Sequence, residues 1–86
     1  MRHRRVSIAL GHVLREARRS RGISQEELAL RCGLDRTYPS MIERGLRQPT
    51  VGVLLTIADV LNIAAATLIN RTLEELNRHR GAERPN

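Results

Sequence analysis

The sequence predicts an all-α fold, a compact bundle of five short helices. With 86 residues, the chain has the length of one small domain. Phe and Trp are absent, so a core must be built from Leu, Ile, Val, Ala and Met, which suits packed helices better than a sheet. Apolar residues also recur at helical spacing, in runs that end at glycine or asparagine.

The first helix is expected to run from Ser7 to Arg21. Gly22 tolerates a positive φ and is expected to end this helix. Residues 1–6, MRHRRV, are interpreted as a loose basic tail. The apolar stripe of the helix consists of Ile8, Leu10, Val13, Leu14 and Ala17.

Two shorter helices are expected next, separated by a break of three residues. Ser24 and Glu27 have the spacing of a capping box at the start of the segment SQEELALRC. Gly33 is expected to end this helix, and Asp35 is expected to cap the next one. Two short helices joined by a three-residue turn that contains Gly are typical of a helix-turn-helix motif. The residues expected to face the core are Leu28, Ala29 and Cys32.

The back half predicts two more helices. Thr50 can cap a helix over residues 51–62, which Asn62 would close. A fifth helix is expected over residues 64–78, so that the domain spans residues 7–78, and residues 79–86 are interpreted as a frayed tail. The apolar stripe of the fourth helix would be Val51, Leu54, Leu55, Ala58 and Leu61, and that of the fifth Leu68, Ile69, Thr72, Leu73 and Leu76.

The positive charge is confined to the front of the chain. The net charge is +6; residues 1–50 hold eleven Arg against five acidic residues, whereas residues 51–86 hold four of each. This distribution indicates that the front half contacts a polyanion and that the back half packs or pairs.

Several other functions are disfavoured by the residues present. A single cysteine, Cys32, can form no internal disulfide, and the histidines His3, His12 and His79 lack ligand spacing, so we expect no metal or cofactor. We find no nucleophile–base pair and no phosphate loop, and therefore do not expect an enzyme. No apolar run approaches the ~20 residues that a bilayer requires, and we expect a cytoplasmic, nucleoid-associated protein that does not enter a membrane.

The segments SQEELA, GLDRTY and IERGLRQP occur in order within residues 14–63. In this order and spacing they resemble the Cro/repressor-type (xenobiotic-response-element) helix-turn-helix family, which includes lambda-repressor-like proteins. The resemblance implies a homodimeric, sequence-specific transcriptional regulator, most simply a repressor, that binds an inverted-repeat operator in double-stranded DNA through the major groove.

The resemblance also implies roles for particular residues. The positions that would read bases are Arg36, Thr37, Ser40 and Met41. The positions that would bind phosphates are Gln25, Tyr38, Arg44 and Arg47. Arg36 can fork onto O6 and N7 of guanine, and Thr37 can offer a methyl to thymine and a hydroxyl to a base or phosphate. Alternatives stay open for most of these positions. Arg36, Thr37 and Ser40 would then be ordinary solvated surface residues. Met41 would pack sideways, Tyr38 would serve the core, and Gln25 would serve only the helix cap.

Two structural features accompany these contacts. By resemblance, Arg18 and Glu43 form a partly buried salt bridge between the first helix and the recognition helix. Pro39 stands where the family usually has Ile or Val, and its ring cannot donate the backbone bond of that position. Either the helix keeps its start after an Asp35 cap, with a distorted first turn, or it begins at Pro39 after an extended lead-in. We favour the first, with Pro39 in a buried apolar slot.

The fifth helix is interpreted as the dimer interface, through Leu68, Ile69, Leu73 and Leu76. The alternative is a helix that folds back on its own domain. An antitoxin-type or accessory regulator would instead use this helix to hold a partner protein as well as binding DNA. A single aromatic residue argues against an RNA-binding protein, because bases of single-stranded RNA are usually stacked on aromatic side chains.

Overall fold

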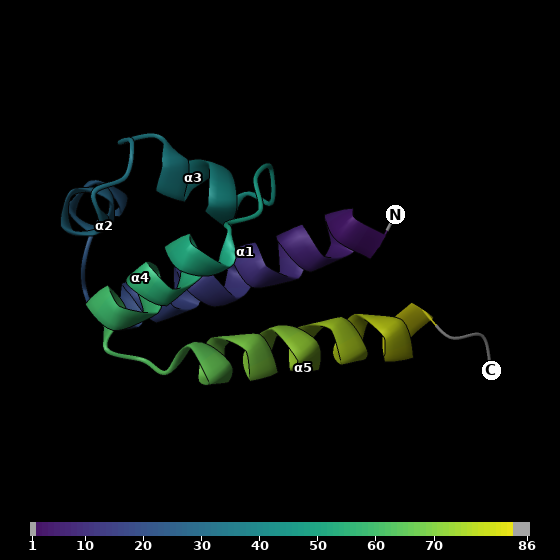
Figure 1. Cartoon of the computed structure of the whole chain (residues 1–86). Coiled ribbons are helices and arrows are strands. Elements are labelled where there is room, and N and C mark those ends of the chain that lie inside the picture. The colour runs from purple at the N-terminus through teal and green to yellow at the C-terminus, as the bar shows by residue number, and fades with distance from the viewer. Residues whose placement is uncertain (1, 84–86) are drawn as a thin grey trace.

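Five helices and no strand make up the part of the chain that the computed structural model describes, residues 2–83, with side chains described for residues 4–78. The helices are α1 (Arg2–Ser20), α2 (Gln25–Cys32), α3 (Tyr38–Glu43), α4 (Val51–Leu61) and α5 (Ala65–Glu83). α3 lies on one side of α1 and α4, and α5 lies on the other side (Figure 1). The all-α prediction is confirmed.

Local stop and cap signals were predicted well. Ser24 accepts a hydrogen bond from the backbone N–H of Glu27 (3.0 Å), and Thr50 accepts one from Val53 (3.1 Å). Gly33 ends α2 with a φ of 68°, and Asn62 ends α4 with a φ of 55°.

The outer helices are longer than predicted. α1 begins at Arg2, so the basic residues expected in a loose tail belong to the helix. α5 continues to Glu83, so residues 79–83 are helical, and the rest of the expected frayed tail lies outside the described residues. No stop signal is present in the sequence at either place, and the predicted boundaries rest only on where the apolar stripes end.

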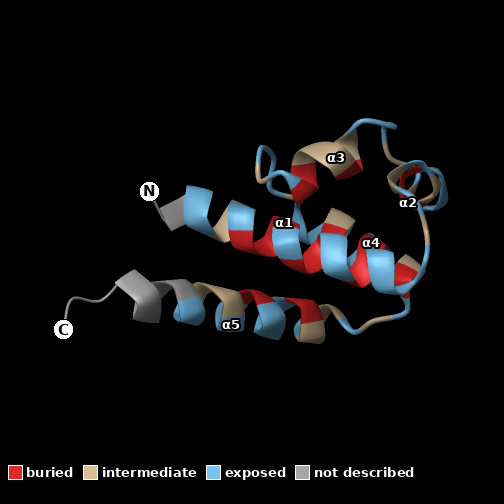
Figure 2. Cartoon of the chain, turned by 180° about the vertical axis from the view of Figure 1, so that it is seen from behind, coloured by how far each residue is buried: buried red, intermediate tan, exposed pale blue. Residues whose placement is uncertain are grey.

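Most of the core lies between α1, α4 and α5, whose buried faces point toward one another (Figure 2), and Leu28 of α2 and Ile42 of α3 complete it. Two predicted core residues of α4 are exposed instead: Val51 at 73% and Leu55 at 54%. The buried face of α4 runs through Leu54, Ile57, Ala58 and Leu61, which includes Ile57, a residue we had omitted. Val51 and Leu55 lie at the edge of that stripe. Ile8 of α1, expected to be buried, is also partly exposed.

Between Arg2 and Glu83, no single helix is long and apolar enough to cross a membrane. Only the pair Val51–Leu61 and Ala65–Arg78, bent by 107°, has the required length and composition.

Candidate nucleic-acid interface

Helix α3, which the resemblance implies is the recognition helix, begins later than the favoured alternative predicts. Its N-cap is Thr37, so Pro39 is the second helical residue, a position whose N–H has no partner within a helix. Proline therefore removes no helical hydrogen bond there. Arg36 and Thr37 form a turn, closed by a 3.0 Å bond from the Tyr38 N–H to the Asp35 carbonyl, and are not extended. The expected buried position of Pro39 is observed.

Asp35 organises this turn through its side chain. Its Oδ1 accepts hydrogen bonds from the Thr37 backbone N–H (2.9 Å) and from the Thr37 hydroxyl (2.6 Å). The pKa of the Asp35 carboxyl is lowered, first by the bond from the hydroxyl and then by the bond from the backbone. The carboxylate is thus ionised at neutral pH, and it holds Thr37 in place without being the N-cap of α3.

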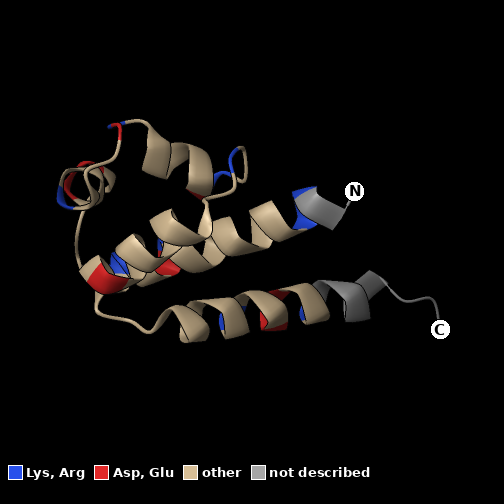
Figure 3. Cartoon of the chain, in the orientation of Figure 1, with Lys and Arg blue, Asp and Glu red and all other residues tan. Residues whose placement is uncertain are grey.

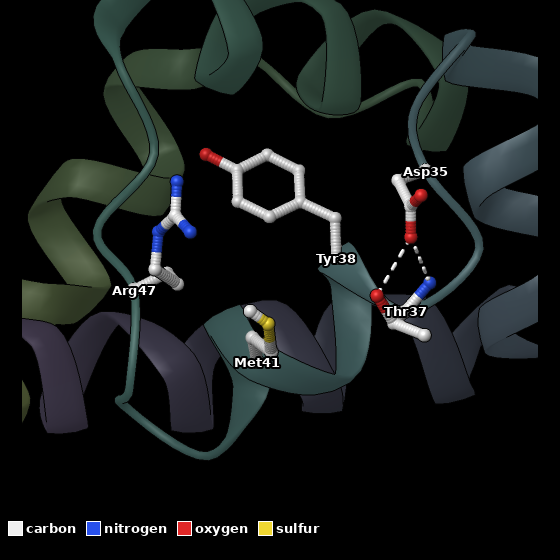
Figure 4. Close-up of a pocket in the computed structure, with 5 residues that line it drawn as sticks. All are labelled: Asp35, Thr37, Tyr38, Met41 and Arg47. Atoms are coloured by element: carbon white, nitrogen blue, oxygen red, sulfur yellow. Dashed lines mark hydrogen bonds between the residues drawn. The ribbon is translucent and has the colours of Figure 1, made fainter.

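A shallow hollow of about 320 Å³ opens beside this turn. It is lined by Asp35, Thr37, Tyr38, Met41 and Arg47 (Figure 4). The Tyr38 hydroxyl and the Arg47 guanidinium lie at one end, Asp35 and Thr37 lie at the other, and Met41 lies between them. The Arg47 guanidinium carbon is 5.5 Å from the centroid of the Tyr38 ring, a cation–π geometry.

The four expected base-reading residues are divided between the turn and the helix. Arg36 and Thr37 lie in the turn, while Ser40 and Met41 lie on α3 and are half-buried. The Arg36 side chain is 79% exposed, and its nearest charged partner is Glu26 at 3.9 Å, also exposed, which leaves Arg36 able to reach outward.

Among the expected phosphate-binding residues, Gln25 is placed differently from the rest. Its Nε2 donates a 2.9 Å hydrogen bond to Oε1 of Glu43, so part of its donor capacity is used within the fold. Arg44 is the C-cap of α3 and Arg47 follows in the loop; both are exposed. Figure 3 shows basic segments in the turn before α3 and in the loop after it.

The interface rests on a buried network centred on Glu43. Arg18 of α1 donates to both carboxylate oxygens, from Nε at 2.7 Å and from Nη2 at 3.1 Å. A third Arg18 bond, from Nη1, reaches the Ile23 carbonyl at 2.8 Å. With Gln25 added, Glu43 ties α1, α2 and α3 together and fixes the orientation of the recognition helix. The structure thus contains the salt bridge that the resemblance implied.

Sequence reasoning missed a close contact between α1 and the end of α3. A Cβ on Gly11 would lie 2.5 Å from the Ile42 carbonyl oxygen and 2.7 Å from that of Glu43. Only glycine allows the backbones to approach this closely. A glycine within an otherwise regular helical stripe was the available signal.

The expected dimer residues fall into two groups. Leu68 has no exposed area and belongs to the core of its own domain, so it offers no surface to a partner; this part of the expectation is wrong. Ile69 and Leu73 are about half exposed, and Leu76 is half-buried. A hollow of about 400 Å³ adjoins them, lined by Val6, Leu10, Gln48, Pro49, Val51, Leu54, Ile69, Thr72, Leu73 and Leu76.

Residues 14–68, more than half of the chain, match the helix-turn-helix family HTH_3. The chain belongs to this family. This helix-turn-helix protein is 40% identical over 57 residues to the uncharacterised HTH-type transcriptional regulator y4dJ of Sinorhizobium fredii, a match that covers 66% of this chain and 74% of the relative.

Two solved structures share the fold of this helix-turn-helix protein. The restriction-modification controller protein C.AhdI of Aeromonas hydrophila has a TM-score of 0.75 and 38% identity, with 79% of this chain and 99% of that chain covered. The controller protein C.Esp1396I, as a tetramer on its natural 35 base-pair operator, has a TM-score of 0.72 and 31% identity, with 81% and 92% covered. The chain is thus a DNA-binding transcriptional regulator of the helix-turn-helix, controller-protein type.

Proposed function

We propose that this chain is a homodimeric repressor that reads an inverted-repeat operator through the major groove. The observation that carries the proposal is the entry to α3, where Arg36 and Thr37 project from a turn whose supporting side chains are fixed. A recognition helix contacts base edges mainly with the residues at its start, so this is the end of α3 where reading residues are needed.

Phosphate contacts would hold the helix in register from both sides. Arg44 and Arg47 lie at the exit of α3, and Gln25 lies at the first residue of α2, where free N–H groups attract an anion. The Gln25 bond to Glu43 orients its amide and leaves the second amide proton for a phosphate oxygen.

The arrangement of the helices constrains the dimer. Because α3 and α5 lie on opposite sides of α1 and α4, a two-fold pairing through the outermost face of α5 would point the recognition helices in opposite directions (Figure 1). Pairing through a lateral face lets both point toward one duplex. We therefore place Val51 and Leu55 of α4 in the interface, beside Ile69 and Leu73 of α5, all partly or largely exposed.

Two further observations support an oligomer on DNA. The back half carries no net charge, so its exposed leucines, isoleucine and valine are not opposed by like-charge repulsion between copies. The related controller protein C.Esp1396I binds its operator as a tetramer.

Selection of bound sequences from a random DNA pool tests the proposal. We expect an inverted repeat whose affinity falls steeply as salt rises, because bound arginines release counterions. Arg36→Ala should relax the base preference at one position by about 1–3 kcal/mol, whereas Arg47→Ala should weaken all sequences alike. Equal losses on selected and random DNA for both variants would contradict these roles.

A reporter gene tests the repressor role separately. With the operator upstream of the reporter, supplying the protein should lower expression of the reporter; a rise would contradict the repressor role.

A second candidate, an accessory regulator that holds a partner protein, is favoured by the hollow of about 400 Å³ beside α5. Mass measurement in solution separates the two. Twice the chain mass of 9.7 kDa supports the homodimer, and a monomer that gains mass only with a co-expressed partner supports the second candidate.

A further inference from the structure

The Thr37 hydroxyl has already used its only proton. A threonine hydroxyl carries one donor and two acceptor lone pairs. Here the proton points to Oδ1 of Asp35 at 2.6 Å, a short bond to an ionised acceptor, and such bonds are stronger than neutral ones. The backbone N–H of Thr37 donates to the same oxygen at 2.9 Å, which fixes the direction of the carboxylate. Toward DNA, Thr37 therefore offers lone pairs and a methyl group, and no donor.

We infer that Asp35 positions Thr37 to contact a base only as a hydrogen-bond acceptor. Thr37 would then select the orientation of a base pair in which the exocyclic amino group faces its hydroxyl oxygen. This inference rests on the proposed function and adds to it the chemistry that one position of the operator must have. In the major groove, adenine N6 and cytosine N4 carry amino groups, whereas guanine and thymine present acceptors at the same edge. An acceptor facing an acceptor forms no hydrogen bond and leaves both groups unpaired.

The Asp35 carboxylate strengthens this selection by repulsion. It lies beside the Thr37 hydroxyl and is exposed, so it would approach the same base edge. A negative charge near the O6 and N7 acceptors of guanine is unfavourable, while an amino group facing it is favourable. Asp35 thus orients the Thr37 side chain and also disfavours a base pair that presents an acceptor at this position.

The two ends of the hollow in Figure 4 differ in chemistry and would favour one orientation of a nucleotide bound across it. Arg47 and the Tyr38 hydroxyl form a donor end that suits a phosphate, and Asp35 and Thr37 form an acceptor end that repels one. Met41 supplies an apolar floor between them. A nucleotide that places its phosphate at the donor end directs its base toward the acceptor end.

The test uses the selected operator, with each base pair of one half-site replaced in turn by the other three pairs. Wild-type protein should show one position at which reversing the pair, A·T to T·A or C·G to G·C, lowers affinity by about threefold to tenfold, the value of one hydrogen bond. Thr37→Val keeps the shape and the methyl group but loses the acceptor, and should abolish the preference at that position alone. Thr37→Ser keeps the hydroxyl and should retain it.

Asp35 is tested as a positioning residue at the same position. Asp35→Ala frees the hydroxyl proton to donate to guanine or thymine, so the preference should flatten there. Asp35→Asn keeps an acceptor oxygen and should restore at least half of the lost preference. A variant's melting curve shows whether it is folded. If Asp35→Ala lowers affinity for all four pairs equally, Asp35 is only structural and the inference is overturned.

The failures of the two proposals are distinguishable. Wild-type protein that selects no duplex sequence overturns the proposed function, and the inference with it. Wild-type protein that selects an operator, while Thr37→Val leaves every position unchanged, overturns only the acceptor reading.

Discussion

The two sides of this molecule are held together by different forces. Around α2 and α3, hydrogen bonds of defined geometry join Arg18, Gln25 and Glu43 near the turn that precedes α3. Around α4 and α5, apolar packing dominates and part of the apolar surface stays exposed. Hydrogen bonds fix orientation within narrow limits, as base reading requires, whereas apolar surface can pair with a second copy. The comparison predicts that single substitutions in the front half change the stability and DNA contacts of one chain. Substitutions in the back half should mainly change the association between chains.

The largest effect is expected from breaking the buried network. Arg18→Met should lower the free energy of unfolding by about 3–5 kcal/mol, because Glu43 is left as a buried charge without its cation. Urea unfolding measures this loss. The matched control is Arg31→Met, which removes the half-exposed ion pair with Glu27 and should cost at most about 1 kcal/mol. Equal losses for both variants would contradict the role of burial.

Adding one methyl group at the contact of α1 with α3 should have the next largest effect. Gly11→Ala forces a Cβ against two carbonyl oxygens and should cost about 1–3 kcal/mol, with a loss of operator affinity because α3 is displaced. Gly52→Ala is the control, since the nearest atom is Thr50 Oγ1 at 3.9 Å; it should cost nothing and gain up to about 1 kcal/mol. If the Gly11→Ala variant kept the wild-type stability, α1 and α3 could move apart without cost, and the requirement for glycine at this contact would be contradicted.

Disrupting the apolar side should act on association more than on folding. Leu73→Glu should leave the chain folded, halve its mass in solution and weaken operator binding by about tenfold or more, because an unpaired charge enters the proposed interface. Light scattering and DNA titration measure the two effects. Leu30→Glu, on the exposed side of α2, should change the mass little. A Leu73→Glu variant that keeps the wild-type mass would move the interface elsewhere.

The smallest effect concerns the pH dependence of the turn before α3. Because the pKa of Asp35 is lowered in the folded chain from its ordinary value of 3.8, its stabilising contribution is complete above that value and is lost as pH falls through the lower native pKa. The difference in Tm between wild type and Asp35→Ala should therefore be constant from neutral pH to about pH 4 and shrink below it. A difference that grows on acidification would contradict the sign.

The same comparison explains what the sequence could and could not predict. Ser24, Gly33, Thr50 and Asn62 were assigned correctly because caps and stops depend on a few neighbouring residues. The start of α3 was not, since it depends on whether Asp35 bonds the Thr37 N–H or caps a helix, and Pro39 can be accommodated by either.

The remaining differences depend on tertiary contacts that no local pattern reveals. The burial of Leu68 and the exposure of Val51 follow from how α4 and α5 pack on α1, although both are apolar residues at helical spacing. The bond from Gln25 to Glu43 joins positions 18 residues apart. Gly11 is required only because α1 crosses the end of α3.

Protection of guanine N7 on the selected operator tests the central claim most directly. If two copies lay α3 into one face of the duplex, methylation protection should appear in two successive major grooves whose centres are about 10 base pairs apart, roughly 34 Å. Both footprints should disappear together in Leu73→Glu at concentrations that saturate the wild type. A single protected groove occupied by one chain, or guanine N7 atoms that stay reactive throughout an operator saturated with protein, would contradict the account.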